Sequence, residues 1–521
     1  MKLLKKESLY SNIRIGYIIA VMIYSLARQN ITALQPYLMG EILNLAVIGI
    51  AGLLVLWDVV IFRNIWKTKY IWILAAFGVF TVISSIAGFK YGYVENVKAI
   101  ANLFIQFCLL YVVGVKKDNK SLEKEFRIIG NGLAAFWFVA ALISVYMYFA
   151  DIFYTQDRLL WGEASEIVQG FVREHRGVVV MRLWGIFVDP NFASAICIAV
   201  ICISLFVIIS SKNKVIRALH IVNIIIQYIY IVLSNSRMGL LILCLAVFVG
   251  VWYYGFLLLN RKKLHIALKE LIAVVLAVVC AGACYGSVLV TKNVLPYVRY
   301  AYTFVIDQFT HEETTTLPAE DTTEEITTDD ETTTEEDVSS ETTTEAETTT
   351  EEITTEEPSS DKNVIENLDR QDVVVKSDVS NGRFGLWMEG INNVYKEHFI
   401  LGVGPRNYHT AANEINPKLS ISTGYSIHNS FIELLMGNGT IGTLILLAFL
   451  ILCAKDAIVI RYKDSEKAKK AGILMVAVLS LLACGMFIAC LFYTLSGATV
   501  ILFTCLGYAV RIITNKNETR D

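Results

Sequence analysis

The sequence lacks most of the short motifs that carry enzyme chemistry in soluble proteins. It has no glycine-rich phosphate loop followed by Lys-Ser or Lys-Thr, no nucleophile elbow, and no cysteines or acidic residues at metal-ligand spacing. All ten cysteines fall inside apolar stretches, which argues against a disulfide framework and favours a packing role. From these absences we expect no metal and no other cofactor.

Charged residues are also scarce, and long apolar runs take their place. Only 18% of the 521 residues are charged, 55% are hydrophobic, and the mean hydropathy is +0.53, a balance that is unusual for a soluble domain. About twelve windows have the roughly 17 to 25 residues that a helix needs to cross a bilayer. No cleavable signal peptide is expected, because the first apolar stretch has no small-residue cleavage site. The windows are 15–35, 42–62, 70–89, 97–115, 128–150, 186–210, 217–234, 238–259, 266–290, 429–453, 470–490 and 493–512.

Basic residues are concentrated in alternate loops between these windows. More than half of the 45 Lys and Arg residues lie in one set of loops, and most of these loops are short. By the positive-inside rule this set is cytoplasmic, and with twelve spans both termini are cytoplasmic too. The set comprises Lys2, Lys5, Lys6, Arg14, Arg63, Lys67, Lys69, Lys116, Lys117, Lys120, Lys124, Arg127, Lys212, Lys214, Arg217, Arg261, Lys262, Lys263, Lys269, Lys455, Arg461, Lys463, Lys467, Lys469, Lys470, Arg511, Lys516 and Arg520.

The predicted fold is an all-α polytopic membrane protein with one large outer loop between spans nine and ten. Residues 1–290 hold spans one to nine, 291–428 form the extracytoplasmic loop, and 429–521 hold spans ten to twelve and a cytoplasmic tail. Inside the loop, 312–357 is almost entirely Thr, Glu and Asp, so it has no core to bury and should be disordered. The part from 373 to 428 should be ordered.

Two candidate arginines lie in outer segments other than the large loop. Arg237 follows the polar turn 234–236 between two spans, and its planar guanidinium suits bidentate contact with phosphate. An arginine at this depth is costly and should face a cavity or a partner, although an interfacial snorkelling role is the alternative. Arg182 precedes Asp189 and Asn191, and those two residues are equally well explained as the cap of the next helix.

The ordered part of the large loop supplies the other candidates. His428 stands at the outer mouth of a span, where the positive helix end should favour its neutral form and let it accept a proton. Asn429 and Glu433 share a helix face and could form a polar shell beside it. Arg383 and Arg406 could contact an anion, though solvated loop arginines are common. Apolar residues at helical spacing predict an amphipathic helix over 384–399.

Taken together, these motifs resemble those of the O-antigen ligase and polysaccharide polymerase family. The resemblance covers roughly residues 180–450. It implies a GT-C-like glycosyltransferase whose site faces outward from the bacterial cytoplasmic (inner) membrane. The matching residues are Arg182 with Gly185 and 189–191, Ser236 and Arg237 with Gly239, Arg383 with Trp387, 401–404 with Asn407, the pair His428 and Asn429, and 439–442.

The resemblance also implies a reaction and its partners. A glycan would pass from undecaprenyl pyrophosphate to an acceptor hydroxyl, by a polymerase or a ligase, in a metal-independent single displacement that inverts the anomeric centre. The implied partners are the lipid-linked donor, a glycan, lipid or wall-polymer acceptor and the bilayer, with chain-length regulators left open and no nucleic acid. The implied catalytic residues are His428 and Arg237, and the implied substrate-binding residues are Arg182, Arg237, Arg383, Arg406 and Asn429.

Two other classes of protein stay open on the sequence alone. A lipid-linked glycan flippase would share the many spans and a cationic cavity, but it would more often show midplane ionisable residues and an internal repeat. Asp58 is a lone charge within its apolar window, and the sequence shows no repeat of the spans. A non-catalytic assembly or sensor protein that presents the acidic tract is the third possibility.

Overall fold

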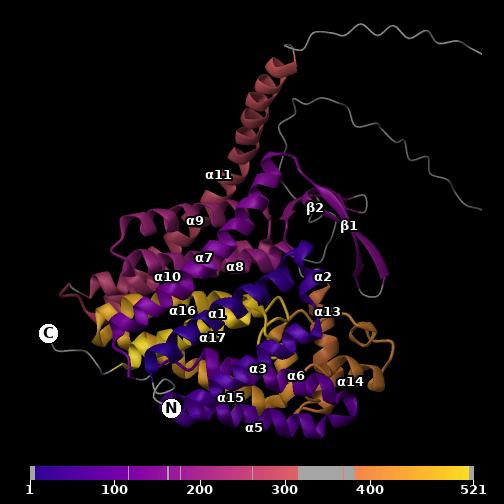
Figure 1. Ribbon diagram of the computed structural model, residues 1–521, viewed down its shortest axis with the longest axis vertical. Coiled ribbons are helices and arrows are strands. Elements are labelled where there is room, and N and C mark those ends of the chain that lie inside the picture. Colours follow the sequence, from indigo (N-terminus) through magenta and orange to yellow (C-terminus); the bar gives the residue numbers. More distant parts are fainter. Residues whose placement is uncertain are drawn as a thin grey trace, which may run out of the picture. The chain divides into compact units, whose positions relative to one another are not determined.

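The computed structural model describes residues 6–114, 116–160, 163–175, 178–260, 262–314, 368 and 382–515 (Figure 1). The chain divides into two compact units, one of Met1–Leu295 with Leu368–Asp521 and the other of Pro296–Asn367. All candidate site residues belong to the first unit. The tract 312–357, which was predicted to be disordered, lies outside the described residues from residue 315 onward.

The predicted all-α polytopic fold is confirmed for the membrane part. Within the described residues, ten helices are long and apolar enough to cross a membrane, and each overlaps one of the predicted windows. They are α1 (Glu7–Asn30), α3 (Glu41–Trp57) with its π-helical continuation η2 (Asp58–Phe62), α7 (Asn119–Phe149), α8 (Pro190–Ser210), α9 (Lys214–Leu233), α10 (Arg237–Leu259), α11 (Ile266–Thr314), α15 (Ser430–Lys463), α16 (Ser465–Gly485) and α17 (Gly497–Thr514).

The two remaining windows hold shorter helices. The window 70–89 contains α5 (Ile71–Ala87), and the window 97–115 contains α6 (Tyr93–Ile105) with the π-helix η4 (Gln106–Leu110). The other short helices are η1 (Thr32–Leu34), α2 (Gln35–Leu38), α4 (Asn64–Lys67), η3 (Phe89–Tyr91), α13 (Arg383–Glu389), η5 (Gly390–Tyr395), α14 (Tyr408–Ile415) and η6 (Ser420–Thr423). Together α13 and η5 confirm the helix predicted over 384–399.

The outer segment between α7 and α8 holds a small sheet that the sequence analysis did not predict. There β1 (Tyr154–Leu160), β2 (Glu163–His175) and β3 (Val178–Gly185) form an antiparallel sheet in the order β1-β2-β3. β-Branched valines begin β3, and such residues favour strands. A sheet also depends on pairing between residues far apart in sequence, which no single window displays.

Helix α11 contradicts the predicted end of span nine at residue 290. It runs for 49 residues from Ile266 to Thr314, with Pro296 inside it. No glycine occurs between residue 287 and the end of the helix, so only the proline opposes helix propagation there. The segment assigned to the start of the outer loop is therefore helical.

Helices α8, α16 and α17 form the centre of the bundle. Helix α16 packs against α8, α10, α15 and α17, and α17 also packs against α1. Of the most apolar window of α17, 83% is buried inside the protein, against 17% for α11. The central helices therefore owe their position to protein contacts, whereas α11 exposes most of its apolar surface, as a lipid-facing helix does.

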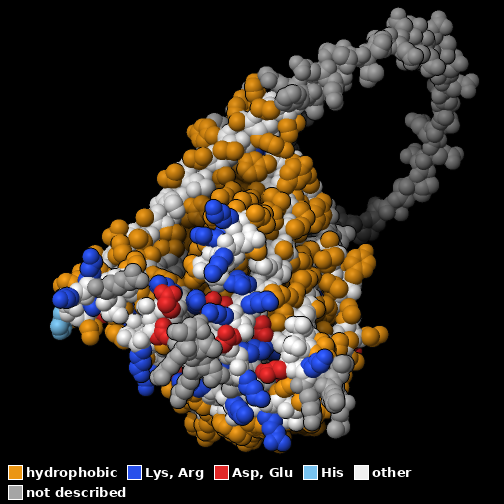
Figure 2. All heavy atoms as spheres, turned by 60° about the vertical axis from the view of Figure 1, so that its left-hand side comes forward, with side chains coloured by type: hydrophobic (Ala, Val, Ile, Leu, Met, Phe, Trp, Pro, Cys, Tyr) orange, Lys and Arg blue, Asp and Glu red, His pale blue; other side chains and the backbone are white. Residues whose placement is uncertain are grey.

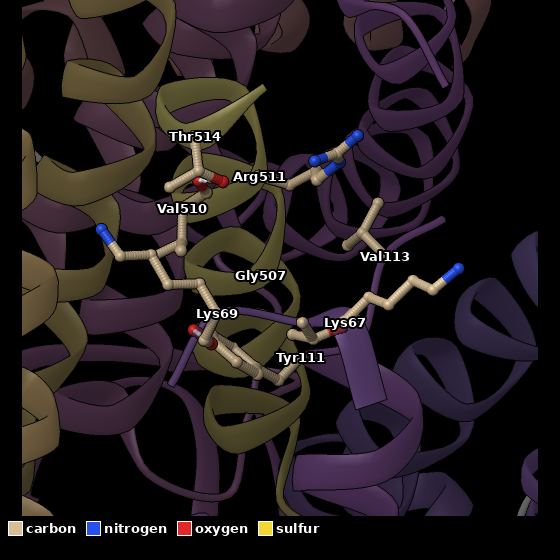
Figure 3. Close-up of a pocket in the computed structure, with 9 residues that line it drawn as sticks. Lys67, Lys69, Tyr111, Val113, Gly507, Val510, Arg511 and Thr514 are labelled. Atoms are coloured by element: carbon tan, nitrogen blue, oxygen red, sulfur yellow. Dashed lines mark hydrogen bonds between the residues drawn. The ribbon is translucent and has the colours of Figure 1, made fainter. Parts of the chain in front are cut away.

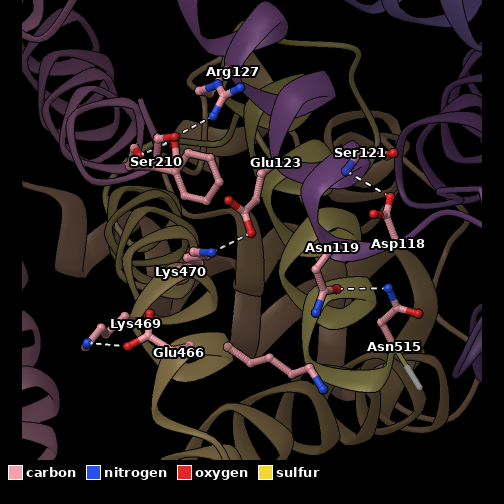
Figure 4. Close-up of polar contacts among 12 residues, drawn as sticks. Asp118, Asn119, Ser121, Glu123, Arg127, Ser210, Glu466, Lys469, Lys470 and Asn515 are labelled. Atoms are coloured by element: carbon pink, nitrogen blue, oxygen red, sulfur yellow. Dashed lines mark hydrogen bonds and ion pairs between the residues drawn. The ribbon is translucent and has the colours of Figure 1, made fainter. Parts of the chain in front are cut away.

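Many of the loops predicted to be cytoplasmic meet at one end of this bundle. Figure 2 shows Lys and Arg side chains gathered on a face that hydrophobic side chains border. Asp118 caps α7 there, Lys470 pairs with Glu123 at 2.5 Å, and the side chains of Asn515 and Asn119 are hydrogen-bonded (Figure 4). Polar contacts thus join the start of α7 to the start of α16 and to the end of α17.

Arg14 was assigned to a cytoplasmic loop from the sequence, and the structure corrects that assignment. It lies inside α1, is 3% exposed, and donates to the main-chain carbonyls of Leu109 at 3.0 Å and Leu110 at 3.4 Å. These carbonyls belong to the π-helical turn η4. The guanidinium therefore satisfies backbone groups where the regular helix pattern fails.

Candidate functional site

Three helices begin close together at the other end of the bundle. The cap of α8 is Asp189, which accepts from the main-chain N–H of Asn191 at 2.8 Å. Ser236 caps α10, and Asn429 caps α15 by accepting from two main-chain N–H groups at 2.9 and 3.1 Å. Helix N-termini carry partial positive charge, so this end of the bundle favours an anion.

Arg237 and Arg383 add two full positive charges at this place. Arg237 is the first residue of α10 and is exposed, and Arg383 is the first residue of α13 and is half-buried. Burial lowers the pKa of Arg383, Asp189 raises it, and the charge of Arg237 lowers it. Within the described part of the chain, neither guanidinium has a hydrogen-bond or ion-pair partner. Two cations held near each other in this way suit a multiply charged anion.

His428 lies in the field of Arg383 and Asp189. Burial and the nearby Arg383 lower its pKa, while Asp189 acts in the opposite sense. Its backbone is in the left-handed region at φ 47°, directly before the cap residue Asn429. This conformation costs free energy for a non-glycine residue, so contacts in the surrounding loop must stabilise it. The imidazole is thus half-buried and biased toward its neutral form.

Trp387 connects the Arg383 helix to the His428 loop. Its indole Nε1 donates to the main-chain carbonyl of Ile427 at 3.0 Å, one residue before His428. Trp387 is four residues after Arg383, so both side chains lie on the same face of α13. Gly390 packs so closely on Ile427 that a Cβ there would be 3.0 Å from its Cδ1. The helix and the loop therefore form one packed unit.

Arg182 is buried beneath the turn that carries Arg237. Its Nε donates to the main-chain carbonyl of Ser234 at 2.9 Å, and one terminal nitrogen donates to the Asn191 side chain at 2.6 Å. The Ser236 hydroxyl donates to the same Asn191 oxygen at 2.8 Å. Arg182 thus lies in the predicted region, but its guanidinium group is hydrogen-bonded to protein groups that hold the turn between α9 and α10.

The other two predicted substrate contacts are engaged as well. Arg406 forms an ion pair with Glu95 at 3.0 Å, and both side chains are partly exposed. The side-chain oxygen of Asn429 caps α15. The predicted shell partner Glu433 is buried in the first turn of α15. The structure therefore brings together Arg237, Arg383 and His428 but gives Arg406 and Asn429 partners within the protein.

Sequence reasoning treated Asp189 as a helix cap and as part of a motif that resembles the family's, and gave it no role in the chemistry. The structure confirms the cap and also makes Asp189 the acidic neighbour of both Arg383 and His428. The signal that could have revealed this was its position, because Asp189 directly precedes a span that starts on the same predicted side as Arg237 and His428. An acidic residue near a histidine can stabilise the imidazolium that forms on proton transfer.

Comparison with known proteins addresses the same region. A family model described as O-antigen ligase matches residues 221–447, a stretch that includes Arg237, Arg383, Arg406, His428 and Asn429. No curated protein matches the chain. The match, the many membrane-spanning helices and the paired cations beside a histidine agree with one another. On this basis residues 221–447 form a region of the O-antigen ligase type.

Proposed function

We propose that this protein transfers a glycan from undecaprenyl pyrophosphate to an acceptor hydroxyl at the outer face of the bacterial cytoplasmic membrane. The family match supports the general type of activity, a polysaccharide ligase or polymerase that uses lipid-linked glycans in a membrane. The observation that supports the specific proposal is that Arg383 lies near both Arg237 and His428, where three helices begin. Both termini would be cytoplasmic, and the site would face outward.

In this proposal Arg237 and Arg383 hold the donor pyrophosphate. Arg237 lies near enough to Arg383 for its charge to lower the pKa of Arg383. Within the described residues, neither arginine forms an ion pair with an acid. The pyrophosphate would supply the missing counter-charge. Because the leaving group is already ionised and is stabilised by two cations, no general acid is required.

His428 acts as the general base. The acceptor O–H proton passes to the neutral imidazole while the acceptor oxygen forms a bond to the anomeric carbon. The bond between that carbon and the pyrophosphate oxygen breaks, and its electron pair leaves with the lipid pyrophosphate. One displacement inverts the anomeric centre. Asp189 stabilises the imidazolium until the proton is lost to water.

Arg182, Asn429 and Arg406 take supporting places in this mechanism. Arg182 holds the 234–236 turn so that Arg237 projects from a fixed helix start. Asn429 fixes the start of α15 directly after His428. Arg406, in its ion pair with Glu95, anchors the ordered loop against α6. Preorganisation of this kind keeps the reacting groups in place without a direct substrate contact.

The experiment uses purified protein in lipid bilayers with an undecaprenyl-pyrophosphate glycan and an acceptor. Release of lipid pyrophosphate together with an enlarged acceptor supports the proposal. Movement of the donor across the bilayer without release would instead identify a flippase. The structure gives little support to a flippase. Asp58, the ionisable residue that such a mechanism would use, already accepts hydrogen bonds from the Asn64 side chain at 2.7 Å and from the Ile65 N–H at 3.0 Å.

A further inference from the structure

A cavity lies at the end of the bundle opposite the glycan site. It has a volume of about 300 Å³ and opens between the loop before α5, the segment after η4 and the last turns of α17 (Figure 3). Helix α5 starts at this cavity, and the glycine after its far end packs on Val403 of the outer loop. Lys69 at the cavity pairs with Asp456 late in α15, whose first turn follows His428. The cavity is therefore separate from the glycan site.

The wall of the cavity carries a surplus of positive charge. Its nine lining residues include Lys67, Lys69 and Arg511 and no acidic residue. Asp456, which is not part of the wall, pairs with Lys69 at 2.5 Å. Lys67 is exposed and has no hydrogen bond or ion pair in the part of the chain that the structure describes. Figure 3 shows the cationic ends of Lys67 and Arg511 on one side of the cavity and that of Lys69 on the other.

Contacts within the protein hold the segments of the wall together. Tyr111 is 1% exposed, and its hydroxyl donates to the main-chain carbonyl of Lys69 at 2.8 Å. Gly507 of α17 lies so close that a Cβ there would be 2.4 Å from the carbonyl oxygen of Tyr111. The three segments are thus locked together. A preformed wall lowers the ordering cost of binding a ligand.

The surroundings of Lys67 point to the membrane surface. Trp66 and Trp72 stack with ring centroids 5.4 Å apart, and their side chains are 50% and 64% exposed. Exposed tryptophans of membrane proteins concentrate at the level of the lipid headgroups. An opening beside such a pair lies where headgroup phosphates are abundant.

We propose that this cavity binds the phosphate group of an anionic phospholipid headgroup. Lys67 and Arg511 would contact the phosphate oxygens, and Lys69 would hold the wall through Asp456. A volume of about 300 Å³ lies at the lower limit of small-molecule sites, which fits a headgroup and not a larger cofactor. This proposal is independent of glycan transfer, because it uses none of the residues of that site.

The test measures lipid binding by native mass spectrometry on the full-length protein. The probes are short-chain phosphatidylglycerol and phosphatidylcholine with the same acyl chains. Binding of each lipid is measured with and without inorganic phosphate as a competitor. The variant is Lys67→Ala with Arg511→Gln. The control, Lys212→Ala with Lys262→Ala, removes two exposed cations from other loops of the same predicted side. Elution as a single species in gel filtration checks that each variant is folded.

The wild-type protein should prefer phosphatidylglycerol, and the cavity variant should lose about 25-fold in affinity, from roughly a fivefold factor for each cation near a charged lipid surface. The control variant should bind like the wild type. Equal loss in the control would mean diffuse attraction and would overturn the proposal. So would equal affinity for the two lipids, or displacement of the lipid by inorganic phosphate at comparable concentration.

Discussion

The Nε–H of Arg182 donates to the main-chain carbonyl of Ser234 at 2.9 Å, across 52 residues of sequence. This contact joins the end of the outer sheet to the turn that precedes Arg237. It gives a buried arginine a structural task in a region where the sequence suggested a ligand contact.

Replacement of Arg182 by lysine should therefore weaken the fold as well as the activity. Lysine has one nitrogen in place of the two that bond Ser234 and Asn191, so at least one of these bonds should be lost or weakened. Hydrogen bonds of a charged group contribute about 1.5–3 kcal/mol each. We expect the free energy of unfolding in detergent to fall by about that amount. Arg217→Lys, at an exposed position on α9, is the matched control. Unchanged stability together with weakened donor binding would return Arg182 to the role of a ligand contact.

Trp387→Phe should slow the transfer step without disturbing the ring packing. The indole hydrogen bond to Ile427 is lost, and a bond of this kind is worth about 1 kcal/mol, or roughly a fivefold change. We expect kcat to fall by about that factor and KM for the donor to change less, because His428 shifts and the arginines do not. Trp72→Phe, an exposed tryptophan elsewhere, should have no effect on kcat. A change confined to KM would show that Trp387 serves the donor site instead.

The pH dependence of transfer should report His428. Since burial and Arg383 lower its pKa, the rate should fall on the acid side with a midpoint below the ordinary value of about 6.5. Asp189 favours the protonated ring, so Asp189→Asn should move that midpoint to lower pH, while asparagine still caps α8. Asp118→Asn changes the cap of α7 at the other end of the bundle and should leave the profile in place. A shift to higher pH in Asp189→Asn would contradict the assigned interaction.

Arg237 and Arg383 should act on the same anion. Lysine at either position keeps the charge but loses the planar fork, and we expect transfer to fall at least about tenfold in each variant. The double variant should lose less than the product of the two single effects, because both contacts serve one pyrophosphate. Arg406→Lys, in a partly exposed ion pair with Glu95, should change the rate little. Strict multiplicativity of the Arg237 and Arg383 effects would argue for two separate binding sites.

Deletion of residues 315–356 should be almost harmless. The tract is rich in Thr, Glu and Asp, and the closure entropy of a flexible loop changes only slowly with its length. We expect transfer activity and membrane insertion close to those of the full chain. Loss of activity in a correctly inserted deletion variant would show that the tract has a role beyond that of a spacer.

The sequence predicted what depends on local patterns. Apolar windows located the helices, the apolar spacing after Arg383 located α13 and η5, and the alternation of loops put Arg237, Arg383 and His428 on one side. Each of these follows from composition, from helical period or from the positive-inside rule, and each can be read within a short stretch of chain.

What the sequence could not predict depends on contacts between distant segments. The sheet of β1 to β3 needs pairing partners, and the buried position of Arg14 depends on the π-helical turn at Leu109. The same is true of Arg182 and Arg406, because their partners Ser234 and Glu95 come from other elements. The sequence identifies an arginine, but it does not show whether its guanidinium group contacts a ligand or a main-chain carbonyl.

The central claim is that the neutral imidazole of His428 takes the acceptor proton beside two donor-binding arginines. The most direct measurement compares donor binding and single-turnover transfer in wild type and His428→Ala. We predict that transfer falls by about 100- to 10,000-fold, the usual loss on removal of a general base, while the affinity for the lipid-linked donor is nearly unchanged. Transfer at the wild-type rate in a variant that binds donor normally would contradict the account.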